Sequence, residues 1–191
     1  VLIIFAAGNE GFSGVGRPPD RAVDDYRTFA VAAVDGNTQG WPIASFSSRG
    51  PTFCTPDGSA AIKPDISGPG VNVRSSVPGG GYSNSSGTSM STPHINGVVC
   101  LMREVNPDLD IEGIKQIIFD TAFDLGDPGE DNFYGWGMVD AYEAVVAAMS
   151  GDIPMRLQTS LFTAGVEGTA DIFRATPEEN VALYYSIAGM G

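Results

Sequence analysis

Apolar residues recur with two different periods along the chain, and these periods predict strands mixed with helices. Short β-branched or aromatic runs between turn residues predict strands at residues 1–7, 28–34, 43–47 and 71–76. Apolar positions three and four residues apart predict helices at residues 89–104, 111–122 and 139–149. Strands and helices mixed in this way indicate an α/β layered fold.

The first strand and the first helix are the most apolar of these elements. Residues 1–7 are all apolar, which is typical of a central parallel strand covered on both faces. The helix at 89–104 is apolar on nearly every side, so we expect it to be buried, with Gly97 allowing another backbone to approach. Asp110 precedes the second helix as its expected N-cap. Because a fold rarely begins inside a buried strand and the chain opens without Met, we expect residues upstream of Val1.

The composition changes after Ser150, which predicts a boundary between two domains. Short alternating runs broken by Gly and Pro predict strands at residues 156–163, 169–174 and 181–187. About 40 residues are too few for a β-domain that is stable alone. We therefore expect residues 1–150 to belong to one domain, and residues 151–191 to begin a β-rich accessory module that continues beyond this chain.

Composition and charge exclude several classes of protein. Of the 191 residues, 42% are hydrophobic and 17% charged, which indicates a globular chain. The 23 acidic against 10 basic residues give a net charge of −13, which argues against nucleic acid as a partner. The longest apolar run, residues 1–7, is far shorter than the roughly 20 residues of a membrane span. Cys54 and Cys100 lie outside any Cys-x-x-Cys pattern, so we expect two isolated thiols, although one bridge between them is compatible with the sequence.

Candidate chemistry centres on Ser89, which stands between a Gly/Ser-rich loop and the apolar helix. A helix N-terminus offers free N–H groups and a partial positive charge, and both stabilise a developing oxyanion. Physical reasoning alone leaves two interpretations open, a nucleophile or a serine that merely caps its helix.

The motif Gly-Thr-Ser-Met-Ser-Thr-Pro-His at residues 87–94 resembles the serine signature of subtilisin-like serine proteases, and this resemblance implies that Ser89 is the nucleophile. Ala-Ala-Gly-Asn-Glu-Gly at residues 6–11 would otherwise indicate an ordinary turn. It resembles the family segment that carries the oxyanion-hole asparagine, here Asn9. Further matching motifs occupy residues 44–50, 63–66, 68–71 and 134–137. The resemblance covers about residues 1–148, the carboxyl-terminal half of the family's catalytic domain.

The resemblance implies a parallel-sheet sandwich with helices on both faces and a serine endopeptidase that hydrolyses peptide bonds through a Ser-His-Asp triad. In the family the catalytic Asp and His lie upstream of the strand at 1–7. The one histidine, His94, follows Ser89 by five residues, which rotates it about 140° around a helix from the serine. It matches a family histidine that packs behind the serine, so we expect a hydrogen-bonded core residue. The expected partners are a polypeptide substrate and the missing amino-terminal half of the domain, and the chain alone is expected to be inert.

Substrate contacts, cofactors and location follow from the same resemblance. Ala6, Ala7 and Gly8 would line the primary specificity pocket, and Glu10 at its rim would favour a basic group unless it is simply a solvated carboxylate. The chemistry requires no cofactor and no metal ligand is assigned. Many family members hold structural calcium, but the oxygen-rich residues 124–132 lack the EF-hand order of ligands, which favours a solvated acidic loop. The expected location is extracellular or at the cell surface.

One other function and one related family compete with the subtilisin-like peptidase. A subtilisin-like module that has lost catalysis could bind peptides or partners, but it would have no chemical need of Ser89 and Asn9. A related family with a Ser-Glu-Asp triad also uses the serine of a Gly-Thr-Ser motif as nucleophile. The members of that family are expected to carry an Asp at the oxyanion position, where this chain has Asn9. The sequence therefore favours the serine endopeptidase.

Overall fold

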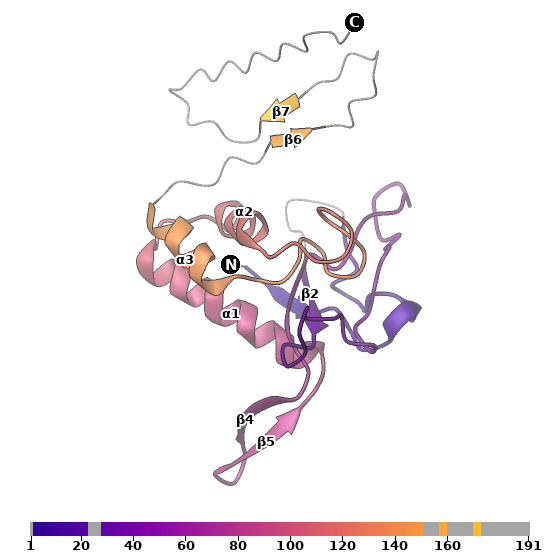
Figure 1. Ribbon diagram of the computed structural model, residues 1–191. Helices are drawn as coiled ribbons and strands as arrows, with labels where there is room; N and C mark the ends of the chain where they lie inside the picture. The colour runs from indigo at the N-terminus through magenta and orange to yellow at the C-terminus, as the bar shows by residue number, and fades with distance from the viewer. Residues whose placement is uncertain (1, 23–27, 151–156, 160–169, 173–191) are drawn as a thin grey trace, which may run out of the picture.

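A computed structural model describes residues 2–22, 28–150, 157–159 and 170–172. Its centre is a parallel sheet of three strands in the order β1 (Ile4–Ala6), β2 (Phe29–Val34) and β3 (Ile66–Pro69) (Figure 1). All six residues of β2 are buried, whereas the residues of β1 are only half-buried. The α/β class with a parallel sheet is confirmed. In the described part of the sheet, however, β2 is the central strand and β1 lies at the edge, because β1 pairs with β2 alone.

Three helices pack with this sheet around one hydrophobic core (Figure 1). They are α1 (Thr88–Val105), α2 (Ile111–Thr121) and α3 (Ala141–Ser150), close to the ranges predicted from the apolar periodicity. The predicted N-cap is confirmed, since the Asp110 carboxylate accepts a hydrogen bond of 2.6 Å from the Gly113 amide. The core combines sheet residues with residues from each helix: Phe29, Val31, Ile66, Ile95, Val98, Met102, Ile114, Ile117, Ile118, Ala144 and Ala148.

Only one face of α1 is buried, which corrects the prediction of a helix covered on nearly every side. The buried positions follow helical spacing: Thr88, Ser91, Ile95, Val98 and Met102. On the other face Leu101 is 54% exposed, and a Cβ added to Gly97 would meet nothing within 4 Å. The close approach of α1 to the sheet depends on a glycine of another segment, since a Cβ on Gly70 would collide with the Gly87 carbonyl oxygen at the start of α1.

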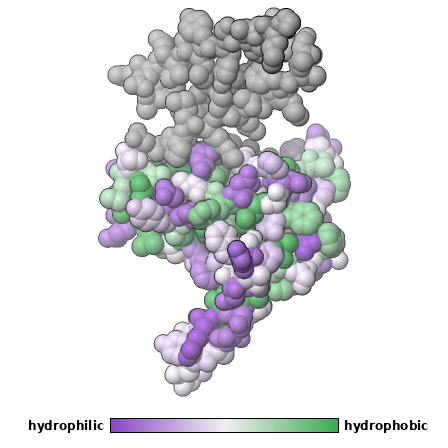
Figure 2. Space-filling model, viewed as in Figure 1, coloured by the Kyte–Doolittle hydropathy of each residue, from purple (hydrophilic) through white to green (hydrophobic). Residues whose placement is uncertain are grey.

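The predictions for the loops were less accurate than those for the helices. Residues 43–47 form no strand, because Ile43 makes a single antiparallel bridge to Val34 and the chain then turns. The strand predicted at 71–76 is β4 (Val73–Val77), which pairs antiparallel with the unpredicted β5 (Gly81–Ser85). This hairpin projects from the body and is largely hydrophilic (Figures 1 and 2). The strand β3 was missed because its sequence, Ile-Ser-Gly-Pro, lacks a β-branched run.

In the tail, β6 (Leu157–Thr159) and β7 (Ala170–Ile172) pair antiparallel within two of the predicted strand ranges. The third range, 181–187, lies outside the described residues. The division into a domain at 1–150 and a module at 151–191 stays a prediction. In the described part of the chain, no helix is both long and apolar enough to cross a membrane.

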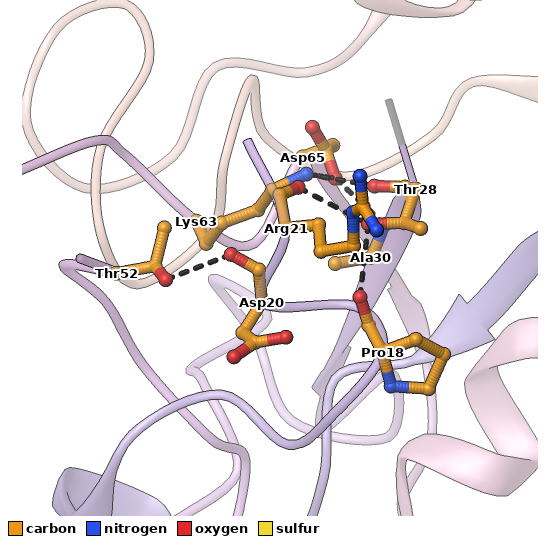
Figure 3. A network of polar contacts seen from close by, with 8 residues as sticks. All are labelled: Pro18, Asp20, Arg21, Thr28, Ala30, Thr52, Lys63 and Asp65. Carbon is orange, nitrogen blue, oxygen red and sulfur yellow. Dashed lines mark hydrogen bonds and ion pairs between the residues drawn. The ribbon is translucent and has the colours of Figure 1, made fainter. Parts of the chain in front are cut away.

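A buried ion pair supports the start of the central strand (Figure 3). The Lys63 side chain is 2% exposed, and its Nζ donates to Asp65 Oδ2 at 2.6 Å and to the Thr28 carbonyl at 2.7 Å. The same carboxylate oxygen accepts a hydrogen bond of 2.6 Å from the Ala30 amide of β2. Asp65 therefore neutralises a buried ammonium and holds the strand backbone at the same time.

We expect Asp65→Ala to destabilise the fold by about 3–5 kcal/mol, because it leaves the Lys63 charge buried without its carboxylate. Urea denaturation of the natural protein, meaning the full-length protein to which this chain belongs, measures this change in the free energy of unfolding. Asp108→Ala, which alters an exposed aspartate, serves as the control and should change the free energy of unfolding by no more than about 0.5 kcal/mol. Equal unfolding midpoints for the two variants would contradict this role of the pair.

Candidate active site

The turn after β1 and the first residues of α1 meet at the carboxyl edge of the sheet. Asn9 Oδ1 lies 2.9 Å from the Thr88 amide nitrogen and 3.1 Å from Thr88 Oγ1. Thr88 is completely buried and directly precedes Ser89, so the structure brings Asn9 beside the residue next to the candidate serine. Ligand sites of open α/β sheets lie at this edge.

The contact with Thr88 sets the orientation of the Asn9 side-chain amide. A backbone N–H can only donate, so the atom facing it must be the carbonyl oxygen of Asn9 and the NH2 group points elsewhere. Among the described residues nothing accepts a hydrogen bond from that NH2 group or from the Ser89 amide. Two free donors at a helix N-terminus form a site that can stabilise an anion.

Thr88 is a site residue that the sequence reasoning included only as part of a motif. Besides its contacts with Asn9, its hydroxyl lies 3.2 Å from both the amide nitrogen and the carbonyl oxygen of Gly8. It therefore joins α1 to the two residues that follow Ala7. In the sequence, the signal for Thr88 as a site residue was its place between Gly87 and Ser89. Only its contacts with Asn9 and Gly8 in the tertiary structure reveal that it joins the helix to the turn.

Ser89 itself is exposed and lines an open cavity of about 300 Å³ between α1 and β4. The cavity is lined by Val73, Arg74, Ser75, Ser89, Met90, Pro93 and His94. This corrects the prediction for His94, which is exposed and shares the cavity with Ser89 instead of lying in the core. Its Nδ1 is 2.9 Å from the Met90 carbonyl oxygen and must donate to it, which confirms the hydrogen bond but not the burial.

The four predicted substrate-binding residues lie on one strand and turn. Ala6 ends β1 and is half-buried, Ala7 is buried, Gly8 is half-buried and Glu10 is exposed. The structure brings these residues next to Asn9, but their role toward a substrate stays a prediction. Ser48 was not predicted as a site residue, although it lies in the motif at 44–50. Its hydroxyl contacts both the amide and the carboxylate of Glu10, at 3.1 and 3.0 Å.

The carboxylates of the acidic loop at 124–132 accept hydrogen bonds from the loop's own backbone. Asp131 uses both carboxylate oxygens on backbone amides, those of Phe133 and Tyr134 on one side and Asp127 on the other. Asp124 accepts from the Gly129 amide in the same way. No group of three or more potential metal ligands occurs within the described ranges. Whether this protein holds structural calcium stays a prediction.

Two carboxylates away from the cavity have a pKa lowered by hydrogen bonds. Hydrogen bonds from Thr38 and Asn37 lower the pKa of Asp35, and hydrogen bonds from Ser59 and Thr55 lower that of Asp57. Both carboxylates stabilise their own turns. Cys54 and Cys100 are free thiols, as expected.

The fold and the site together define an α/β protein that presents a serine at the start of a helix, beside an asparagine at the end of a parallel strand. The chain belongs to the subtilase family, whose model matches residues 1–137. The similarity to the family inferred from the two motifs is thus confirmed.

Curated relatives carry the same similarity. The chain is 38% identical to bacillopeptidase F of Bacillus subtilis over 200 residues, which cover 94% of this chain and 13% of that protein. It is 41% identical to a thermostable alkaline protease of Halalkalibacterium halodurans over 144 residues, and these residues are 75% of this chain and 34% of that protein. Subtilisin BL of Lederbergia lenta is 37% identical over 144 residues, which are 46% of its length. The chain thus spans less than half of each of these relatives.

Proposed function

We propose that this chain contains the carboxyl-terminal half of the catalytic domain of a serine endopeptidase that hydrolyses peptide bonds, with Ser89 as nucleophile and Asn9 as oxyanion-hole donor. The observation that carries the proposal is the hydrogen bond from the Thr88 amide to Asn9 Oδ1, which joins Asn9 to the residue before Ser89 and leaves its NH2 group to point away from that amide. Membership of the subtilase family and relatives named as proteases support it. Residues 1–150 would form part of the peptidase domain, and residues 151–191 would begin an accessory module.

The chemistry follows from the two free donors. As Ser89 Oγ attacks the scissile carbonyl, negative charge develops on the carbonyl oxygen, and the Asn9 NH2 group and the Ser89 amide can both donate to it. The partial positive charge at the N-terminus of α1 favours the same charge. Because Thr88 holds the amide in place before the reaction, little reorganisation is needed in the transition state. These steps need no cofactor.

The general base would come from a segment upstream of this chain. A serine hydroxyl must lose its proton during attack, and in a Ser-His-Asp triad the histidine accepts it while the aspartate orients the histidine. No hydrogen bond joins His94 to Ser89 in the described part of the structure, and the Nδ1 of His94 is committed to Met90. The cavity of about 300 Å³ beside Ser89 leaves room for a side chain from elsewhere. We therefore expect the isolated chain to be inactive.

Substrate recognition would use the strand and turn that carry Asn9. Small residues at Ala6, Ala7 and Gly8 leave space for a substrate side chain, and the Glu10 carboxylate at the rim would attract a basic one. By the same family resemblance we place the natural protein outside the cell or at its surface, with polypeptides as its substrates.

We expect the natural protein to react at Ser89 with a serine-directed sulfonyl fluoride, because only an activated hydroxyl reacts. Ser89→Ala should abolish both labelling and proteolysis, measured by mass spectrometry and by peptide cleavage. The isolated 191-residue chain should not be labelled, because it lacks the base. Labelling of the isolated chain would mean that His94 or a carboxylate acts as the base. A natural protein that neither reacts nor cleaves would instead favour a peptide-binding module without catalysis.

Asn9→Ala should lower kcat by about 10²–10³-fold, the effect known for the oxyanion-hole asparagine of a subtilisin, and leave KM nearly unchanged, since the oxyanion forms mainly in the transition state. Steady-state kinetics on one peptide substrate give both constants. Asn37→Ala is the matched control, because Asn37 also joins two segments through its side-chain amide, here by donating to the Val71 carbonyl. A similar loss of kcat in both variants would argue for a structural effect.

The isolated chain should expose apolar surface that the rest of its domain would cover. Ile3, Leu101 and Met149 are 58%, 54% and 66% exposed. We expect strong binding of a hydrophobic dye and a broad thermal transition. A sharp cooperative transition with little dye binding would contradict the proposal that this chain is part of a larger domain.

A further inference from the structure

Arg49 is a buried cation that two aromatic rings hold in place. The residue is 8% exposed, and its guanidinium carbon lies 4.2 Å from the centre of the Phe12 ring and 4.9 Å from the centre of the Phe133 ring. The rings meet edge to face, with an angle of 83° between their planes, so they form two walls around the guanidinium. In the part of the chain that the structure describes, no carboxylate pairs with Arg49 and its Nε has no hydrogen-bond partner. The rings therefore supply the favourable contacts that the structure shows for this charge.

An unpaired cation is costly to bury, so this arrangement indicates a specific role for the charge. Removing a guanidinium from water is unfavourable unless the protein offers compensating contacts, and its attraction to aromatic rings strengthens when it is desolvated. Phe12 is itself 80% exposed, so burial of its ring does little to hold the segment that carries it. The contacts of Phe12 with Arg49 and with the edge of Phe133 fasten this segment to the body of the protein.

Phe12 belongs to a single-turn 3-10 helix, Gly11–Ser13, which begins two residues after Asn9. The Arg49 amide donates to the Gly11 carbonyl of this helix at 3.1 Å. Arg49 therefore holds the 3-10 helix in two places, through its main chain at Gly11 and through its side chain at Phe12.

The position of Asn9 depends on the residues around it. Within the described residues, the main chain of Asn9 makes no hydrogen bond, whereas Gly8 and Gly11 on its two sides are both bonded to the segment at 46–49. The contacts with Thr88 hold only the Oδ1 atom of the Asn9 side chain. The direction of the NH2 group therefore depends on where the main chain of the turn places the residue, and a shift of the 3-10 helix would change that direction.

We propose that Arg49 is a positioning residue: held by Phe12 and Phe133, it fixes the turn so that the Asn9 NH2 group stays aimed at the charge that develops in the transition state. This inference rests on the proposed function, since it needs Asn9 to be the oxyanion-hole donor. It extends that function by naming residues outside the catalytic group on which the rate of the chemical step depends.

The first test removes the ring of Phe12 from the natural protein. Phe12→Leu keeps an apolar side chain but cannot attract the guanidinium, so it should lower kcat about tenfold and leave KM nearly unchanged, because a displaced donor loses its effect in the transition state. Phe12→Tyr keeps a ring face and should retain the kcat of the natural protein. Steady-state kinetics on one peptide substrate measure both constants. An unchanged kcat in Phe12→Leu would overturn the proposal.

The second test changes the other side of the same contact. Arg49→Met keeps the apolar stem of the side chain without its charge, and it should lower kcat by the same factor as Phe12→Leu. The two changes combined should reduce kcat little more than either one alone, because each removes the same contact. Fully additive losses would mean that the two residues act separately, which contradicts the proposal.

A double-mutant cycle with Asn9→Ala shows whether the effect passes through the oxyanion-hole donor. Asn9→Ala removes the group that is to be positioned, so Phe12→Leu should have little further effect on kcat in that background. An equal loss with and without Asn9 would overturn the proposal.

Lys115→Met is the matched control for Arg49→Met. Lys115 is 5% exposed and its Nζ lies 5.7 Å from the centre of the Phe29 ring, so the control also removes a buried cation from an aromatic ring, but on α2. It should lower thermal stability and leave kcat unchanged. Equal losses of kcat in Lys115→Met and Arg49→Met would overturn the proposal. Should Arg49→Met fail to fold, Phe12→Leu decides alone, since it changes an exposed side chain.

Two outcomes keep this inference distinct from the proposed function. A natural protein that neither cleaves the peptide nor is labelled at Ser89 would overturn the proposed function and this inference with it. Cleavage that slows in Asn9→Ala but not in Phe12→Leu would overturn this inference and leave the peptidase standing.

Discussion

The geometry of the site depends on the hydrogen bonds between Thr88 and Asn9, two residues that are 79 positions apart in the sequence. The Thr88 amide is one of the N–H groups that a helix leaves without an intrahelical partner at its start. By accepting from it, the Asn9 carbonyl oxygen stabilises the beginning of α1 and joins it to the end of β1. The same contact directs the Asn9 NH2 group away from Thr88, so a single interaction stabilises the fold and orients a functional group.

This contact requires α1 to lie very close to the sheet, and small residues permit that approach. Ser91 donates a hydrogen bond of 2.6 Å to the Ala32 carbonyl of β2, and Gly70 has no room for a side chain against the Gly87 carbonyl oxygen at the start of α1. A side chain at Gly70 would push the helix outward. The position of Ser89 is thus determined by the packing of residues that take no part in chemistry.

The exposure of one face of α1 follows from the same arrangement. Its buried residues face the core with Met102 at one end and Thr88 at the other, whereas Ser89 and Leu101 face away from the core. The proposed nucleophile must reach its substrate, and Ser89 lies on the uncovered side, at the point where the helix begins. His94 lines the same cavity as Ser89. The exposed face of the first turns of α1 therefore presents both of these polar side chains to the cavity.

The sequence by itself determined the α/β class, the three helices with the Asp110 cap, and the family, because periodicity, capping and continuous motifs are local properties of the chain. Only the tertiary structure decided that β1 lies at the edge of the described sheet, that Ile-Ser-Gly-Pro forms a parallel strand, and that His94 is exposed. It also decided that Ser48 holds the carboxylate of Glu10. These features depend on contacts between segments distant in sequence, where strand pairing and close backbone approach override the local preferences of the residues involved.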